Sequence, residues 1–118
     1  MFFYFFDDDG PEERVTEYSE ATFEDIKHVD EDGNEYWYAR KLQKVLEYKE
    51  WRNFSKVIEK AKEACEKAGN VETSHFVDVN KMVRGGVADI PVKDIMLSRY
   101  ACYLIVQNGD PSKEVIAL

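Results

Sequence analysis

Basic side chains recur one helical turn apart in the middle of this sequence. Arg52, Lys56 and Lys60 are spaced i, i+4 and i+8, so on a helix they would form one row. Such a row can follow the phosphates of a nucleic acid, because affinity for a polyanion comes largely from displaced counterions. The same spacing also fits an ordinary solvated helix face, in which Glu59 and Glu63 pair with the bases.

The segment just before this row adds further bases and aromatic rings. An unpaired base that stacks on an aromatic face contributes about 1–3 kcal/mol to binding. The predicted nucleic-acid-binding residues are therefore Arg40, Lys41, Lys44, Arg52, Lys56 and Lys60. The predicted stacking residues are Trp37, Tyr38 and Tyr48. Trp51 and Phe54 fall on the opposite, apolar side of the same helix, and we assign them to the core.

The sequence contains no recognisable catalytic or metal-binding pattern. His28 and His75 are single histidines without a second ligand at i+3 or i+4. The acidic run 30–34 lacks the glutamate that a calcium loop carries at its twelfth position, so we interpret the run as a turn. Gly85 and Gly86 lack the Lys-Ser/Thr of a phosphate loop. We therefore expect a non-enzymatic protein that needs no metal and no other cofactor.

Charge is distributed unevenly along the chain. The net charge of −8 would by itself argue against a polyanionic ligand. Residues 1–35, however, carry thirteen acids and two bases, a net charge of −11, whereas residues 36–118 carry fourteen bases and eleven acids, a net charge of +3. We interpret residues 1–22 as a flexible acidic leader that either keeps the protein soluble or competes with nucleic acid for the basic helices.

The cysteines and the N-terminal residues indicate a cellular compartment. Cys65 and Cys102 belong to no close-spaced motif, so we interpret them as reduced core residues, with a disulfide between them as the alternative. The apolar residues 1–6 are too few for a signal peptide or a membrane span. We expect a cytoplasmic protein that has no membrane partner.

Local patterns predict the elements that position the basic row. Residues 22–25 fit a capping box and predict a short helix through about Lys27. Asp32-Gly33 predicts a tight turn, and residues 35–38 predict a short strand that pairs with residues near Val29. Helical periodicity begins at Ala39, and a second, strongly amphipathic helix over 51–68 stops at 69–70.

The second half of the chain is predicted to be largely helical. Apolar spacing over 76–83 predicts a short helix, followed by a loop at 85–86 and an irregular or extended run through Pro91. Residues 98–107 are apolar almost all round and predict a central buried helix. Arg99 beside this helix needs a partner, either Asp94 or a ligand phosphate. A last helix is predicted from Asp110-Pro111, and we expect the full protein to continue past Leu118.

Together these elements predict an α+β fold. We expect a mostly helical single domain over residues 23–118, with a small antiparallel β-hairpin near its N-terminus and with residues 1–22 as the leader.

Successive blocks of the sequence resemble the DNA-damage-inducible protein D family. They are FEDIKHVDEDGNEYWYARKLQKVLEY from Phe23, WRNF from Trp51, HFVDVNKMV from His75 and LSRYACYLIVQNGDPSK from Leu97. The family in turn resembles the N-terminal BRO domain of viral BRO proteins and phage antirepressors. The resemblance implies a bacterial, nucleic-acid-associated module of the DNA-damage (SOS) response and supplies no catalytic residues. Glu47 departs from the family, which places glycine in a Leu-Gly-Tyr turn, and Lys41 stands where an acid is common.

Two functions remain open at this point. The first is binding of DNA, either single-stranded or held in a recombination filament, through the basic row, with an affinity that falls with salt. The second is an antirepressor-type protein-interaction module, in which a protein partner meets the apolar surface left by the truncated last helix. Its binding would survive moderate salt and would fail when the C-terminal segment is deleted. A metal-dependent nuclease would need ligands that the sequence does not cluster.

Overall fold

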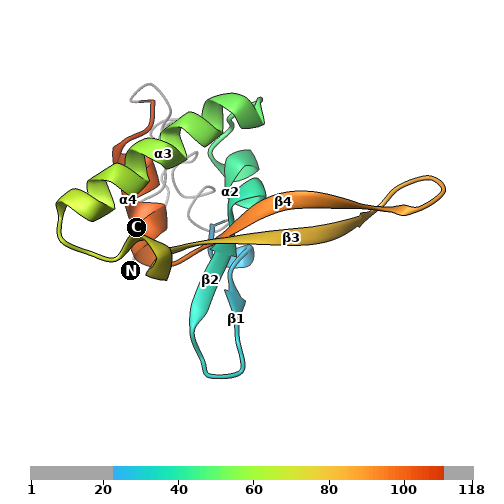
Figure 1. Ribbon diagram of the computed structural model, residues 1–118, viewed down its shortest axis with the longest axis horizontal. Helices are drawn as coiled ribbons and strands as arrows, with labels where there is room; N and C mark the ends of the chain where they lie inside the picture. The colour runs from blue at the N-terminus through green and yellow to red at the C-terminus, as the bar shows by residue number, and fades with distance from the viewer. Residues whose placement is uncertain (1–22, 111–118) are drawn as a thin grey trace, which may run out of the picture.

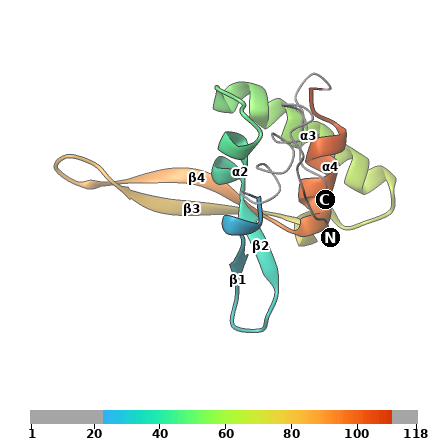
Figure 2. The same ribbon diagram turned by 180° about the vertical axis from the view of Figure 1, so that it is seen from behind.

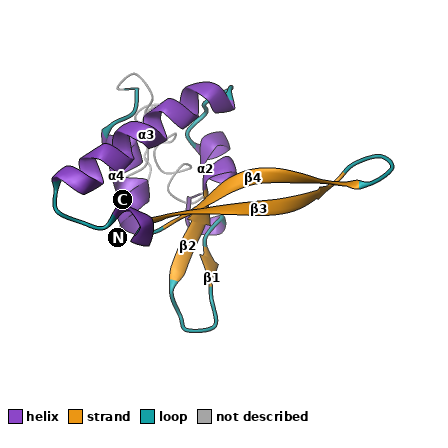
Figure 3. Ribbon diagram, in the orientation of Figure 1, coloured by secondary structure: helices purple, strands orange, loops and turns teal. Residues whose placement is uncertain are grey.

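The computed structural model describes residues 23–110, in which two β-hairpins form one antiparallel sheet. The first hairpin consists of β1 (His28–Val29) and β2 (Glu35–Tyr38), and the second consists of β3 (Phe76–Arg84) and β4 (Asp89–Leu97). Their order in the sheet is β1-β2-β4-β3, so the two hairpins meet along β2 and β4. Figure 3 shows both hairpins in orange beside the helices.

The two hairpins share a junction of only two residue pairs. Trp37 lies opposite Leu97 and Tyr38 lies opposite Met96, and β2 then gives way to a helix. In contrast, β3 and β4 are paired over nine positions, from Phe76 opposite Leu97 to Arg84 opposite Asp89. The second hairpin therefore extends well beyond the rest of the sheet, and Figures 1 and 2 show it as an arm projecting from the body.

The helices cover the base of the sheet on one side. They are α2 (Ala39–Val45), α3 (Trp51–Lys67) and α4 (Arg99–Gln107), with a single 3₁₀ turn at Glu72–Ser74. α4 begins at Ser98, whose hydroxyl accepts a hydrogen bond from the Ala101 amide at 3.0 Å and so caps the first turn. α3 lies against α4, and their buried faces together with Trp37, Leu97 and Phe76 form the core.

Trp37 is the centre of this core. Its side chain is 0% exposed, and the Phe23 ring stacks on it with ring centroids 4.6 Å apart. The indole Nε1 donates to the carbonyl of Phe23 at 3.0 Å, so the polar edge of the ring is satisfied inside the core. This contact fixes the helical residues 23–25, as the sequence predicts; Thr22, the expected cap, lies outside the described residues.

Several predicted elements are confirmed. β2 pairs with β1 around the turn at 30–34, where the amides of Asp32 and Asn34 both donate to Asp30 Oδ1 at 2.9 Å. α3 and α4 lie within one residue of their predicted bounds, and α3 ends next to Gly69, whose φ is +86°. The acidic leader and the helix expected from Pro111 onward lie outside the described residues.

The expectation of a mostly helical domain with one small N-terminal hairpin is wrong. Residues 76–83 form most of strand β3 and not a helix, and the main β-structure lies in the middle of the chain. Short apolar segments fit both periods, and here Val77 and Val79 alternate with the polar residues 78 and 80, as a strand requires. Gly85 and Gly86 then form the turn into β4, whose Pro91 is tolerated because β2 does not pair at that position.

Among residues 23–110, no helix combines the length and the apolar character needed to cross a membrane.

Candidate nucleic-acid interface

α3 presents the predicted basic row on its solvent side. Arg52, Lys56 and Lys60 are all exposed, and each step of four residues advances by about 6 Å along the helix axis. The opposite face of α3 buries Phe54, Ile58, Ala61 and Cys65. Burial of that apolar stripe fixes the rotation of the helix, so the core residues determine that the three bases face water.

The bases of this row have no ionic partners among residues 23–110. Neither an ion pair nor a side-chain hydrogen bond joins Arg52, Lys56 or Lys60 to another residue of the described range. Glu59, which could have neutralised them, lies 3.5 Å from Lys62, and Lys62 also lies 3.8 Å from Glu72. The row therefore keeps its charge available, as a phosphate-binding surface requires.

α2 adds two bases of the same kind. Lys41 and Lys44 are exposed, and neither forms an ion pair with a described residue. α2 is short, and its Ala39 and Leu42 are buried against the core. Five of the six predicted nucleic-acid-binding residues are thus exposed bases on two consecutive helices.

Arg40 differs from the other five because its backbone and side chain both contact residues of the same domain. Its amide donates to Asp94 Oδ1 at 3.0 Å, and its Nε donates to the carbonyl of Lys93 at 2.7 Å. Its guanidinium lies 4.1 Å from the ring centroid of Trp51, a cation–π contact that connects α2 to the start of α3. We therefore assign Arg40 to positioning the two helices on β4.

Asp94 is the buried acceptor on which this arrangement depends. Its side chain is 2% exposed and accepts from the amides of Arg40 and Ile95, while Lys81 Nζ lies 3.1 Å from its Oδ2. A buried carboxylate is tolerated when hydrogen bonds and a counter-ion satisfy it in this way. Sequence reasoning missed Lys81 because residues 76–83 were predicted to be helical.

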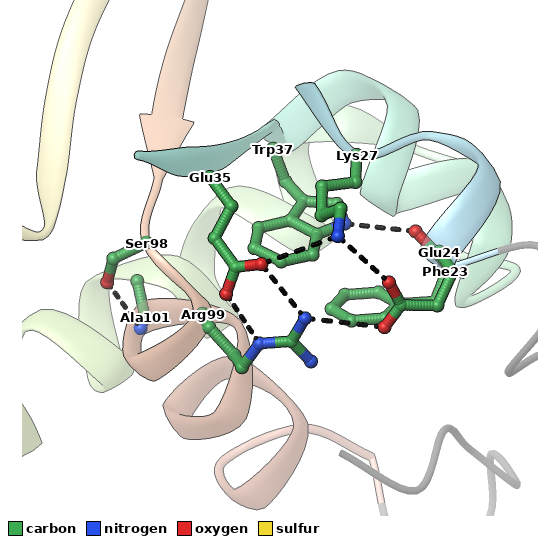
Figure 4. Close-up of polar contacts among 8 residues, drawn as sticks. All are labelled: Phe23, Glu24, Lys27, Glu35, Trp37, Ser98, Arg99 and Ala101. Atoms are coloured by element: carbon green, nitrogen blue, oxygen red, sulfur yellow. Dashed lines mark hydrogen bonds and ion pairs between the residues drawn. The ribbon is translucent and has the colours of Figure 1, made fainter. Parts of the chain in front are cut away.

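Arg99 binds acids that lie far from it in the sequence, and the predicted pair with Asp94 is wrong. Its Nε donates to Glu35 at 2.7 Å, and its second nitrogen donates to Glu35 at 3.1 Å and to Glu24 at 3.4 Å. Lys27 completes the network at 3.5 Å from Glu24 and 3.6 Å from Glu35, as Figure 4 shows. Hydrogen bonding to Arg99, and then the Arg99 charge, hold the pKa of Glu35 below its usual value.

The network around Arg99 also rests on the aromatic core. The guanidinium lies 5.1 Å from the Trp37 ring centroid and 5.7 Å from that of Phe23, so it covers the stacked pair from the solvent side. The network thereby ties the helical turn at residues 23–25 to β2 and α4. Its role is structural, since both of its cations are held by acids of the same chain.

The three predicted stacking residues do not share one surface. Trp37 is buried in the core, so its assignment to base stacking is wrong. Tyr48 packs on Phe54 with ring centroids 5.0 Å apart, and its hydroxyl accepts from the amide of Asp110 at 2.9 Å. Tyr38 lies on the other side of β2 from Trp37, with Lys81 Nζ 3.7 Å from its ring centroid.

An aromatic cluster on the outer side of the first hairpin was missed. His28 stacks on Tyr36 at 5.3 Å, and both rings contact Tyr38 edge-on, at 5.0 Å and 5.6 Å. The two-residue spacing of Tyr36 and Tyr38 on a predicted strand is the signal that could have found it. The acidic turn at 30–34 lies next to this cluster and opposes phosphate binding there.

The described residues contain no group of three or more His, Cys, Asp or Glu side chains that could hold a metal ion.

His75 Nδ1 lies 2.7 Å from Ser98 Oγ, the hydroxyl that caps α4, and its ring contacts Tyr100 edge-on at 4.9 Å. Cys65 and Cys102 are free thiols in the core, and burial raises the pKa of both.

Comparison with known proteins extends these observations. Residues 25–117 match the family model described as BRO family, N-terminal domain. The chain is 53% identical over 96 residues to "DNA damage-inducible protein D" of Escherichia coli (strain K12), a match that covers 80% of this chain and 35% of that relative. The chain thus spans about a third of the length of that relative. No solved structure matches the chain significantly.

Proposed function

This chain belongs to the family defined by the N-terminal domain of BRO proteins, and we propose that it binds nucleic acid as part of a response to DNA damage. The exposed bases of α2 and α3 contact the phosphates in this proposal. The proposed link to DNA damage rests on the name of the Escherichia coli relative, whose match covers most of this chain.

One observation carries the proposal: the row Arg52, Lys56 and Lys60 is exposed and has no ion pair within the described residues. Lys62, by contrast, lies close to Glu59 and Glu72, which offset its charge. A row without such neighbours creates a local positive potential, and phosphates that replace its counterions gain binding free energy from their release.

The acidic total of the chain does not oppose this interpretation. Residues 1–35 carry the whole excess of acids, and the remainder of the chain is positive. Exposed charges act over about 10 Å at 0.1 M salt, so the potential at the α3 row depends on the charges near it.

The test is fluorescence-anisotropy binding of the 118-residue chain to labelled single-stranded and double-stranded DNA over a series of salt concentrations. If three to five phosphates are neutralised, the logarithm of duplex affinity falls by about 2.7–4.5 for each tenfold rise in salt. The Arg52→Glu/Lys56→Glu variant should lose binding at moderate salt and show a slope lower by about 2.

A matched control separates a local contact from a general effect of net charge. Lys56→Glu and Lys93→Glu change the charge equally, but Lys93 lies on β4, outside the row. We expect Lys56→Glu to weaken binding and Lys93→Glu to leave it close to wild type. Equal losses in the two variants, or no binding by the wild type at low salt, would contradict the proposal.

A second function is favoured by a different surface. The β3–β4 arm exposes several apolar side chains, which supports a protein-interaction module, although on another surface than the last helix expected from the sequence. Binding of that kind would survive moderate salt and would be insensitive to the charge of α3. The same salt series therefore distinguishes the two functions.

A further inference from the structure

The outer part of the β3–β4 arm is an apolar surface that the domain does not cover. Met82 is 63% exposed and Ile90 is 53% exposed, Val83 is about half exposed, and Val87 at the turn is fully exposed. Figures 1 and 2 show from opposite sides that the helices lie over the base of the arm and away from its tip.

Strand register distributes these residues over both faces of the arm. Met82 lies opposite Pro91, and Val83 lies opposite Ile90, so each face carries one apolar cross-strand pair near the tip. A two-stranded ribbon on its own is at best marginally stable in water. An arm of this length with apolar residues on both faces is therefore typical of an element that packs against a partner.

The arm carries no net charge, so its surface is not strongly basic. Residues 76–97 contain three bases, Lys81, Arg84 and Lys93, and three acids, Asp78, Asp89 and Asp94, so their charges cancel. Lys81 and Asp94 already pair with each other at the base of the arm. A polyanionic ligand would find no net attraction here, which favours a protein surface.

Two charges near the tip are complementary to each other. Arg84 and Asp89 lie directly opposite on the two strands and point to the same face as Met82 and Pro91. Neither forms an ion pair with another described residue. On this face, the patch thus consists of one apolar pair with one positive and one negative group beside it toward the tip, each available to an outside partner.

We propose that this arm is the contact through which two copies of the chain associate. In a two-fold symmetric contact, the same patch faces itself, so each charge must meet its complement in the other copy. When this face of one arm packs against the same face of a second arm, with both tips in the same direction, Arg84 of each copy lies across from Asp89 of the other. The Met82–Pro91 pairs of the two copies then meet next to these charges. The self-complementary charge of the patch is what identifies a second copy as the partner. The proposal is independent of nucleic-acid binding by α3.

Sedimentation velocity of the 118-residue chain at concentrations from micromolar to several hundred micromolar tests the proposal. The wild type should shift from monomer to dimer as its concentration rises. Arg84→Asp and Asp89→Arg each place four like charges in the contact, and we expect each to weaken dimerisation by about tenfold or more. The Arg84→Asp/Asp89→Arg variant exchanges the two charges and should restore it.

Two further variants keep the result interpretable. Asp32→Arg makes the same change of charge as Asp89→Arg at the exposed turn of the first hairpin and should dimerise like the wild type. Met82→Ser removes apolar surface from the face that carries Arg84 and Asp89 and should weaken dimerisation, while circular dichroism reports that the fold is kept. A wild type that remains monomeric throughout, or single charge variants that behave like the wild type, would overturn the proposal, and so would failure of the exchanged pair to recover.

Discussion

Glu47 occupies, at the end of α2, the backbone position that Gly69 occupies at the end of α3. Their φ angles are +63° and +86°, and each amide donates to the carbonyl three residues before it, at 3.0 Å and 2.9 Å. The next residues, Tyr48 and Asn70, donate to the carbonyls five residues before them. Both helices thus end in the same Schellman motif, which favours glycine at the left-handed position.

Replacing Glu47 with glycine is expected to stabilise the protein. A side chain in the left-handed region costs about 1–2 kcal/mol, while the extra freedom of glycine in the unfolded chain offsets part of that gain. We expect Glu47→Gly to raise the free energy of unfolding by about 0.5–1 kcal/mol, measured by urea denaturation. Gly69→Ala is the reciprocal test: nothing lies within 4 Å of an added Cβ, so its expected loss of about 1 kcal/mol reflects φ alone.

The Glu35–Arg99 pair is expected to make stability depend on pH. Because the folded protein lowers the pKa of Glu35 from its ordinary 4.5, the pair stabilises the fold above that pH, and the contribution is lost as pH falls through the lowered value. Both side chains are more than a third exposed, at 38% and 35%, so we expect only about 0.5–1 kcal/mol.

Urea midpoints of the wild type and Glu35→Gln should therefore differ at pH 7 and converge at a pH below the lowered pKa of Glu35. Glu24→Gln is the matched control, because Glu24 is more exposed and lies 3.4 Å from Arg99; its effect should be smaller. An equal difference between wild type and Glu35→Gln at both pH values would contradict this assignment.

Loss of the Asp94 carboxylate should be costly because two amides depend on it. Asp94→Ala leaves the amides of Arg40 and Ile95 without their acceptor and Lys81 without its counter-ion. We expect a loss of about 2–3 kcal/mol in the free energy of unfolding. Asp94→Asn keeps an oxygen at that place and should lose less. Similar losses for the alanine and asparagine variants would show that the two amide contacts contribute little.

Both cysteines should be inert in the folded protein. Cys65 and Cys102 are buried, and the raised pKa of each thiol keeps it protonated at neutral pH. A thiol reagent such as Ellman's reagent should label neither one in buffer and both in denaturing urea. Absence of labelling in urea would instead indicate that the two are joined in a disulfide.

The parts of the fold that the sequence predicted are those coded by local pattern. α3 has apolar residues in a helical repeat and a glycine at its end, and α4 has a serine cap and a continuous apolar run, so neither depends on distant residues. The basic row on α3 was predicted for the same reason. The turn at 30–34 and the strand after it follow from aspartate and glycine at their usual turn positions.

The parts that could not be predicted depend on contacts between distant residues. Arg99 binds Glu35 and Glu24, which lie 64 and 75 residues away, and no local pattern identifies either one. Trp37 looks like a surface aromatic until the sheet forms, when its face of β2 becomes the core. Strand β3 was mistaken for a helix because its nine residues are too few for periodicity to decide.

The junction of two residue pairs between β2 and β4 has a consequence for how this chain folds. Each hairpin closes a short loop, whereas Trp37 and Leu97 are about 60 residues apart in sequence. Pairing these two residues closes a much longer loop, which costs more conformational entropy. The arm can therefore form early as a local unit, and the domain is complete only when β2 reaches β4. The amides of Trp37 and Tyr38 should accordingly acquire protection from hydrogen exchange late in refolding, after those in the centre of α3.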